Sequence, residues 1–307
     1  MMNDRPLVSI VMPTYNRAHM VGEAIDAVLA QIYTNWELIL VNDGSKDNTR
    51  EVIDGYAARD PRIRCIHKEN EGIPDTVNRG WREATGEYVT WTSDDNLYHP
   101  SSIEAMAAYL DTHADVVLVY TDCRYIDEHG KVTREHQGGD PDVLEDNCPI
   151  MGCLLFRRAV LEAVGPFRKR WRRVHDYDFY RRVYKRFPVA RLPVILYDYR
   201  MHGASMTGNH YAMTTEQAQL LDECFRAEGN GEARRKAWGR CWAEVARQAL
   251  RENRRWVAAW YYARAWLHDS SGARLCINCL KGALYTCLPE TFRRMWRSAK
   301  GVPSGCV

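Results

Sequence analysis

The first 113 residues alternate between short apolar runs and longer segments with helical spacing. Four runs rich in β-branched residues are typical of buried strands: residues 7–12, 36–41, 63–67 and 88–92. Each is followed by a segment whose apolar side chains recur every three or four positions: residues 20–31, 48–58, 73–84 and 100–113. This alternation predicts a parallel sheet with helices on both faces. Ligands of such sheets bind beyond the carboxyl ends of the strands, so the loops after the four runs are candidate sites.

From about residue 207 the strand-like runs stop and only helical spacing continues. Two stretches predict buried helix faces: Trp238, Cys241, Trp242, Val245, Ala246, Ala249 and Leu250, then Trp256, Ala259, Trp260, Ala263, Trp266 and Leu267. The net charge changes from −5 over residues 1–207 (26 basic, 31 acidic) to +7 over residues 208–307 (16 basic, 9 acidic). We therefore predict an α/β domain at 1–207 and a helical region at 208–307, whose tryptophans form a core or a contact with a second copy.

Whole-chain composition excludes several classes of protein. Forty-two basic and 40 acidic side chains give a net charge of +2, too balanced for a chain whose main partner is nucleic acid. The start of the chain lacks the apolar segment of a signal peptide, and the apolar-rich stretches at 256–267 and 275–288 are too short to span a bilayer. Ten cysteines without a secretion signal predict reduced thiols and a cytoplasmic protein. Cys276 and Cys279 form a single CxxC, which we interpret as helical spacing because a zinc site needs a second pair.

Two of the candidate loops carry residues suited to a nucleotide. In the first, Pro13 should end the strand, and Tyr15 would stand at the sheet edge, where its ring can stack on a base. A turn before a capped helix is the simpler interpretation of the same loop. In the second, Asp43 can accept from an N–H donor or a ribose hydroxyl, or it can form an Asx turn. Asn78 lies in the helix after the third run, where plain packing also explains it.

The fourth loop is more specific because it places two adjacent carboxylates, Asp94 and Asp95, after an apolar strand. Adjacent carboxylates repel and raise each other's pKa unless a cation or hydrogen-bond donors offset them. Oxygen ligands of this kind suit Mg2+ or Mn2+ held against a diphosphate. The alternative is a helix N-terminus with solvated acids before Pro100.

Together the loops resemble a known family. Four segments, in this order and spacing, look like those of family 2 glycosyltransferases with the GT-A fold: VSIVMPTYNR, ELILVNDGSKDNT, NEGI followed by GEYV, and TSDDNLYHPSSI. The resemblance covers roughly residues 6–206. It implies a Rossmann-like α/β fold and an inverting, divalent-metal-dependent transfer of sugar from a nucleotide diphosphate, a UDP-sugar, to a hydroxyl of a glycan or lipid-linked glycan. The process would be polysaccharide or glycoconjugate biosynthesis.

The resemblance also assigns the donor side. It places Pro13, Thr14 and Tyr15 along the nucleobase, with Asp43 hydrogen-bonded to it, and Asn78 on the same side. Its DxD-type motif falls on Asp94, near the ribose or metal, and on Asp95, a ligand of Mn2+ or Mg2+. Two positions depart from the family pattern: Thr92 stands where an Asp is common, and Val77 stands where many members have Arg.

The acceptor side follows in the second half of the resemblance. His175-Asp176 resembles a Glu-Asp pair in which the Asp is the catalytic base, although an exposed acid at a helix start would also suit the helix dipole. In Tyr199-Arg200-Met201-His202, Arg200 would contact phosphate and His202 would bind metal or phosphate. With Asp95 and Asp176 on opposite sides of the anomeric carbon, a single in-line displacement inverts the configuration.

Three further segments suggest contacts with the acceptor or a membrane. The basic run 169–173 can steer a phosphate-bearing acceptor, or it can be a solvated loop. Residues 137–149 predict a mobile loop beside the acceptor. The helix from Pro289 has one apolar and one basic side, which is typical of a helix on an anionic membrane surface but also of one packed on its neighbours.

Two other functions remain open at this point. A sugar-phosphate nucleotidyltransferase would share the sheet topology, but it would need a glycine-rich loop with Arg after the first strand. A non-catalytic nucleotide-binding scaffold could use the helical region for partners. The four acids at 43, 94, 95 and 176 argue against a scaffold, while Thr92 and His175 keep it open.

Overall fold

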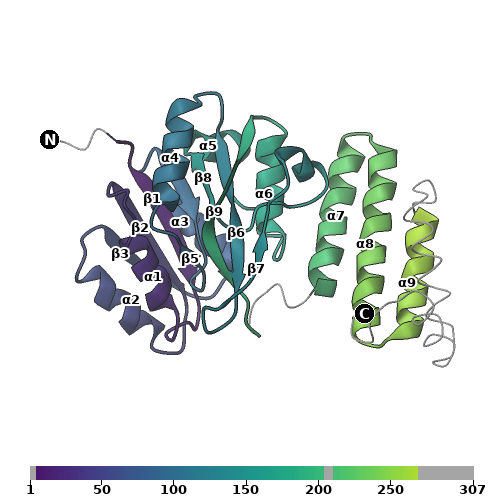
Figure 1. Ribbon diagram of the computed structural model, residues 1–307, viewed down its shortest axis with the longest axis horizontal. Helices are drawn as coiled ribbons and strands as arrows, with labels where there is room; N and C mark the ends of the chain where they lie inside the picture. The colour runs from purple at the N-terminus through teal and green to yellow at the C-terminus, as the bar shows by residue number, and fades with distance from the viewer. Residues whose placement is uncertain (1–4, 204–209, 269–307) are drawn as a thin grey trace. The chain divides into compact units, whose positions relative to one another are not determined.

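The computed structural model describes residues 5–203 and 210–268 (Figure 1). The chain divides into two compact units, Met1–Ser205 and Met206–Val307. The CxxC at Cys276 and Cys279, the apolar stretch 275–288 and the helix expected from Pro289 lie outside the described residues. None of the described helices combines the length and hydropathy needed to cross a membrane.

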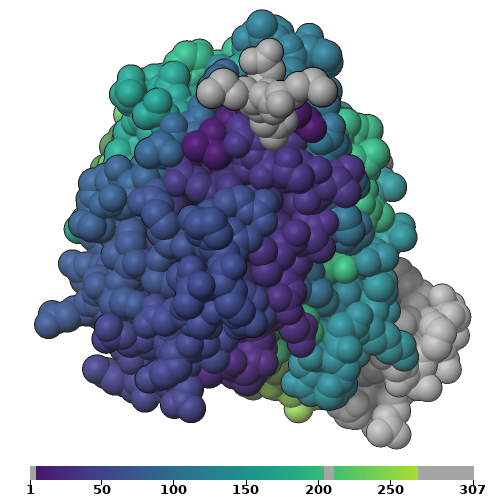
Figure 2. All heavy atoms as spheres, turned by 90° about the vertical axis from the view of Figure 1, so that its left-hand side faces the viewer, coloured from purple at the N-terminus to yellow at the C-terminus, as the bar shows by residue number. Residues whose placement is uncertain are grey.

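The first unit begins with the predicted parallel strands, in the order β3-β2-β1-β4. Their bounds are β1 Val8–Thr14, β2 Trp36–Asp43, β3 Ile63–Lys68 and β4 Tyr88–Trp91. The connecting helices are α1 Val21–Leu29, α2 Thr49–Ala57 and α3 Ile73–Glu83. Figure 2 shows this part of the chain as one continuous purple-to-blue surface. Strands and helices therefore lie within a few residues of where the alternation predicts them.

The second half of the unit makes the sheet mixed. Strand β8 joins β4 antiparallel, and the order continues β8-β6-β9-β5, with β7 paired to β6. These elements are β5 Leu97–Tyr98, α4 Ser102–Thr112, β6 Leu118–Ile126, β7 Val132–His136, the 3-10 helix η1 Pro141–Glu145, β8 Leu154–Arg157, α5 Ala159–Val164, α6 His175–Tyr184 and β9 Val189–Arg200. Side chains of α1 and α4 pack into the main core on one face. On the other face, aromatic rings of α3, β8 and α6 pack together.

The prediction that Pro13 ends the first strand is wrong. Strand β1 continues through Pro13, which pairs with Val41 of β2, and it ends at Thr14. Pairing between β1 and β4 stops at Val11 and Trp91, so Pro13 lies just beyond that ladder. Proline has no backbone N–H, and at this position that N–H would only have extended the ladder between β1 and β4. The pairing between β1 and β2 does not need it, so proline is tolerated in the strand.

Gly80 of α3 gives the fold a testable close contact. A Cβ built at Gly80 would clash with the Val11 side chain of β1, whereas one at Gly55 of α2 would meet only the flexible Arg59 side chain at 3.7 Å. We expect Gly80→Ala to lower the free energy of unfolding by about 1–3 kcal/mol, because overpacking outweighs the better helix propensity of alanine. Denaturant unfolding checks this, with Gly55→Ala as the control. Equal stability of the two variants would contradict the contact.

The second unit contains α7 His210–Ala227, α8 Gly231–Arg251 and α9 Arg255–His268. The predicted core face of α8 is confirmed, since Cys241, Trp242 and Val245 are buried. The prediction that the tryptophans form a core is wrong for α9, whereas the alternative, a contact with a second copy, stays a prediction for this helix. Its buried residues are Ala258, Tyr262 and Ala265, whereas Trp256, Trp260, Trp266 and Leu267 are exposed. Small alanines let α9 approach its neighbours closely, and the tryptophans stand on the remaining surface.

Candidate active site

The predicted donor residues meet at the carboxyl edge of the parallel strands. Thr14 ends β1 and Asp43 ends β2, and the register pairs Thr14 with Asn42. Thr92, the first residue after β4, donates its N–H to the carbonyl of Val11 at 2.9 Å, which keeps the start of the acidic loop on the same edge. Tyr15 is 43% exposed, so its ring is available beside this edge.

Asp43 is buried and accepts hydrogen bonds from its own chain. Its Oδ1 accepts from Lys68 Nζ at 2.5 Å and from the Glu71 N–H at 2.9 Å, and its Oδ2 accepts from the Gly72 N–H at 2.9 Å. Burial alone would raise the pKa of Asp43, but these donors outweigh it and hold the pKa below its usual range. Asp43 is therefore an ionised acceptor that also fixes the turn before α3.

The two adjacent acids have different surroundings. Asp94 is buried, and its Oδ1 lies 3.8 Å from Arg17 Nε. Burial and then the charge of Asp95 raise the pKa of Asp94 to about 7, although Arg17 and the Tyr15 N–H oppose this. Asp95 is directed elsewhere: its Oδ2 lies 3.0 Å from His202 Nε2. Asp95 and His202, 107 positions apart in the chain, thus form the pair that the resemblance assigned to a metal.

Arg200 holds the loop that carries Asp95. Its Nε donates to the Asp95 carbonyl at 3.0 Å, and its two terminal nitrogens donate to the Glu128 carbonyl at 3.0 Å and to Glu23 Oε2 at 2.5 Å. Its backbone N–H donates to Asn96 Oδ1 at 2.8 Å. Each of the three guanidinium nitrogens already donates to a protein oxygen. We therefore interpret Arg200 as a residue that positions the acidic loop rather than as a phosphate ligand.

Asn78 has a comparable structural role. Its Nδ2 donates to the carbonyl of Phe167 and its Oδ1 accepts from the N–H of Phe167, both at 2.9 Å. The amide therefore joins α3 to the segment that leads into α6. We leave Asn78 out of the proposed donor site as well.

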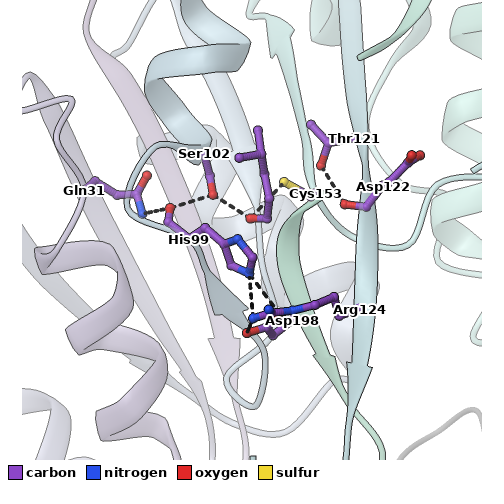
Figure 3. A network of polar contacts seen from close by, with 9 residues as sticks. Gln31, His99, Ser102, Thr121, Asp122, Arg124, Cys153 and Asp198 are labelled. Carbon is purple, nitrogen blue, oxygen red and sulfur yellow. Dashed lines mark hydrogen bonds and ion pairs between the residues drawn. The ribbon is translucent and has the colours of Figure 1, made fainter. Parts of the chain in front are cut away.

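A polar network that sequence reasoning missed sets β9 against the acidic loop (Figure 3). Asp198 of β9 accepts from Arg124 Nε at 2.6 Å, and its Oδ1 lies 3.0 Å from His99 Nε2. Ser102 Oγ, at the start of α4, donates to the Leu196 carbonyl at 2.6 Å. Because Leu97 pairs with Asp198, this network places the end of β9, and His202 beyond it, beside the residues that follow Asp95. These partners are too far apart in the chain for a local pattern to reveal them.

Asp176 lies in the first turn of α6 and is partly buried. Its Oδ1 accepts from the Tyr177 N–H at 2.8 Å. Burial and then the charge of Asp176 raise the pKa of Tyr180 well above its usual range, and the Tyr180 hydroxyl accepts from Trp91 Nε1 of β4 at 3.0 Å. Asp176 therefore lies near the end of β4.

Tyr197 of β9 also contacts the end of β4, and the charge of Asp95 affects its hydroxyl. Burial is the main cause of the raised pKa of Tyr197, and the charge of Asp95 contributes to it. The Tyr197 hydroxyl lies 2.7 Å from Thr92 Oγ1, at the end of β4, and Tyr197 also influences the pKa of Tyr180. Tyr197 and Tyr180 thus connect the end of β4 with the strand that precedes His202 and with the helix that carries Asp176.

Comparison with known proteins agrees with this arrangement. Residues 9–191, more than half of the chain, match the family model described as Glycosyl transferase family 2. The chain belongs to this family. An uncharacterized glycosyltransferase of Rickettsia typhi is 34% identical over 238 residues, which cover 74% of this chain and 71% of the relative. One of Rickettsia felis is 36% identical over 243 residues, 73% of this chain but only 38% of the longer relative.

Solved structures show the same fold as this glycosyltransferase. The fragment 1-349 of S. aureus TarS in complex with UDP-GlcNAc has a TM-score of 0.58 at 15% identity, covering 95% of this chain and 92% of that fragment. The mannosyltransferase PcManGT from Pyrobaculum calidifontis, in complex with GDP-Man and Mn2+, has a TM-score of 0.58 at 19% identity, covering 97% and 85%. The predicted fold class, GT-A with a helical C-terminal region, is confirmed, and the protein is an enzyme.

The segment at 137–149 of this glycosyltransferase is not the loose loop expected from its composition. The Tyr120 hydroxyl donates to the Gly139 carbonyl at 2.5 Å, and Asp122 Oδ1 accepts from the Gly138 N–H at 2.9 Å. At its other end, Arg181 Nε of α6 donates to the Glu145 carbonyl at 3.0 Å. The segment is therefore tied both to β6 and to the helix that carries Asp176, because buried polar side chains at distant positions supply partners for its backbone.

The basic run before α6 is held by buried apolar residues. Phe167, Trp171 and Val174 are buried, whereas the arginines at 170, 172 and 173 are exposed. Lys169 pairs with Asp75 of α3. In this glycosyltransferase the run therefore presents positive charge within six residues of Asp176.

Proposed function

We propose that this glycosyltransferase moves a sugar from a nucleotide diphosphate, a UDP-sugar, to a hydroxyl of a glycan or lipid-linked glycan with inversion at the anomeric carbon. The observation that carries the proposal is the Asp95–His202 pair, 3.0 Å apart at the carboxyl edge of the sheet. Asp176 near the same strand end supplies the second carboxylate that an inverting transfer needs. TarS and PcManGT, whose fold this chain shares, were solved with nucleotide sugars.

On the donor side, we propose that Pro13, Thr14 and Tyr15 line the base and that Asp43 accepts a hydrogen bond from it. An exposed tyrosine ring suits stacking, and the low pKa of Asp43 keeps its carboxylate ready to accept an imide N–H, the group that uracil offers. Thymine offers the same imide N–H, so this acceptor is compatible with uracil or thymine. We propose that Asp94 contacts the ribose.

The pair Asp95–His202 fits a divalent ion that binds together with the donor. Residues 5–203 and 210–268 contain no cluster of three or more His, Cys, Asp or Glu side chains that could hold a metal by themselves. Ions such as Mg2+ are often held by only one or two carboxylates plus substrate phosphates, so one carboxylate and one imidazole suffice for Mn2+ or Mg2+ bound to a diphosphate. When bound, such an ion neutralises charge on the departing nucleoside diphosphate.

The reaction that we propose for the chain's own residues is a single displacement. The acceptor oxygen attacks the anomeric carbon while Asp176 takes the hydroxyl proton, and the bond to the diphosphate oxygen breaks with its electron pair leaving on phosphate. Asp43 and Tyr15 hold the nucleotide, and the Asp95 loop, fixed by Arg200, sets the position of the diphosphate. The exposed arginines of the run 169–173 favour an acceptor that carries phosphate.

The proposal is tested by the configuration of the product. We expect that UDP-sugars with an α linkage, screened with Mn2+ by donor hydrolysis and then supplied with acceptor, give a β-linked product by NMR. A retained α linkage would contradict the role of Asp176. Consumption of a nucleoside triphosphate with a sugar phosphate would instead indicate a nucleotidyltransferase. Nucleotide binding without turnover of any donor would indicate a scaffold.

A further inference from the structure

Helix α9 carries an apolar face that the described part of the second unit leaves uncovered. Trp256 is 77% exposed, Trp260 53%, Trp266 44% and Leu267 73%. Residues 256, 260 and 267 are four and eleven positions apart, so they lie on one side of the helix, with residue 266 beside them. Exposed apolar groups of this size gathered on one face mark a contact surface rather than ordinary solvent-exposed residues. We call these four residues the α9 tryptophan face.

The charges of α9 itself all have one sign. Helix α9 contains Arg255 and Arg264 and no acidic residue, whereas Arg254, which immediately precedes it, lies 3.6 Å from Glu252. The Arg264 guanidinium lies over the rings of both Trp242, in the core, and Trp260, at 4.3 and 4.7 Å from the ring centroids. The cation therefore lies next to an exposed ring of the face, which is how tryptophan and arginine combine where a helix meets a lipid headgroup layer.

The positive charge of α9 indicates which partner covers the α9 tryptophan face. In a two-fold contact the same surface meets itself, so two copies of α9 would bring arginine to arginine with no carboxylate from either helix. Residues 269–307 carry six basic and two acidic side chains, so their net charge of +4 does not offset the charge of α9. An anionic bilayer supplies both an apolar layer for the indoles and negative charge for the arginines.

We propose that the α9 tryptophan face docks on an anionic lipid surface. The indole rings enter the headgroup region while Arg254, Arg255 and Arg264 lie toward lipid phosphates. The contact concerns binding alone, so it stands or falls separately from the chemistry at Asp95. For an enzyme with a lipid-linked acceptor, it would hold the protein at the layer where that acceptor lies.

Co-flotation of the full chain with vesicles tests the proposal. We expect wild-type protein to float with phosphatidylcholine vesicles containing phosphatidylglycerol, and the double variant Trp256→Ala/Trp260→Ala to lose about tenfold or more of that binding. The control Ile32→Ala/Val194→Ala removes exposed apolar side chains of the first unit, which are 59% and 41% exposed, and should float like wild type. Thermal unfolding and donor hydrolysis in solution should be unchanged in the tryptophan variant.

A charge variant keeps the test decisive if the tryptophan variant folds poorly. Arg254→Glu/Arg255→Glu leaves the indoles in place and should also lose flotation, because anionic headgroups then repel the helix. Equal flotation of wild type and both variants would overturn the proposal. It would also be overturned if light scattering showed a wild-type dimer that Trp256→Ala/Trp260→Ala converts to monomer while flotation stays the same.

Discussion

Replacement of Asp95 by alanine is expected to abolish sugar transfer and metal-dependent binding of the donor. Asp95 Oδ2 lies 3.0 Å from His202 Nε2, so its loss removes the carboxylate of the proposed ion site. The several kcal/mol of charge stabilisation lost would lower kcat by about 10³-fold or more. Turnover with Mn2+ and calorimetric donor binding with and without Mn2+ measure this.

The fold should survive this change. Arg200 holds the loop through the backbone carbonyl of residue 95, which alanine retains, so equilibrium unfolding of Asp95→Ala should match wild type. Asp140→Ala serves as the control, because that carboxylate is 81% exposed and lies 3.8 Å from Arg191. Normal turnover of Asp95→Ala would remove the metal from the proposed mechanism.

Replacement of Asp176 by asparagine is expected to lower kcat by about 10²–10⁴-fold, the usual contribution of a general base, while donor affinity stays the same. An amide oxygen can still accept the Tyr177 N–H that Asp176 accepts at 2.8 Å, so α6 should begin as before. The amide cannot take a proton from the acceptor hydroxyl. Single-turnover rates with saturating donor, together with donor binding, separate the two effects.

A neighbour in the same helical turn provides the contrast. Asp178 is buried and pairs with Arg182 Nε at 3.0 Å, so Asp178→Asn should weaken folding and leave donor binding and the chemistry near normal in the folded fraction. If Asp176→Asn lost stability in the same way and kept its kcat, Asp176 would be structural.

Prediction from sequence succeeded where the signal was local. The first four strands each carry an apolar run of their own, so periodicity located them and the edge where Thr14 and Asp43 end, although β4 pairs with β1, whose residues lie 80 positions earlier. The pairing of Asp95 with His202 came from motif resemblance, because no periodic pattern links positions 107 apart.

Several features depend on contacts that no local sequence pattern records. The roles of Arg200 and Asn78 depend on backbone carbonyls of distant residues, which every residue type provides and no motif records. In α9 the tryptophans were expected to be buried because tryptophan is the larger apolar side chain. The alanines are buried instead, because close packing of helices favours the smaller side chain. Pro13 remains in β1 because the N–H that it lacks would face β4, whose pairing with β1 has already ended at Val11 and Trp91.

The hydrogen bonds of Arg200 to the Asp95 loop affect how the donor binds. This buried guanidinium reaches from the last residue of β9 to the main chain of Asp95 and to Glu23 on α1. The loop is therefore ordered during folding, so little conformational entropy is left to lose when the nucleotide arrives. We therefore expect the nucleotide donor to bind rapidly and with little rearrangement of the Asp95 loop.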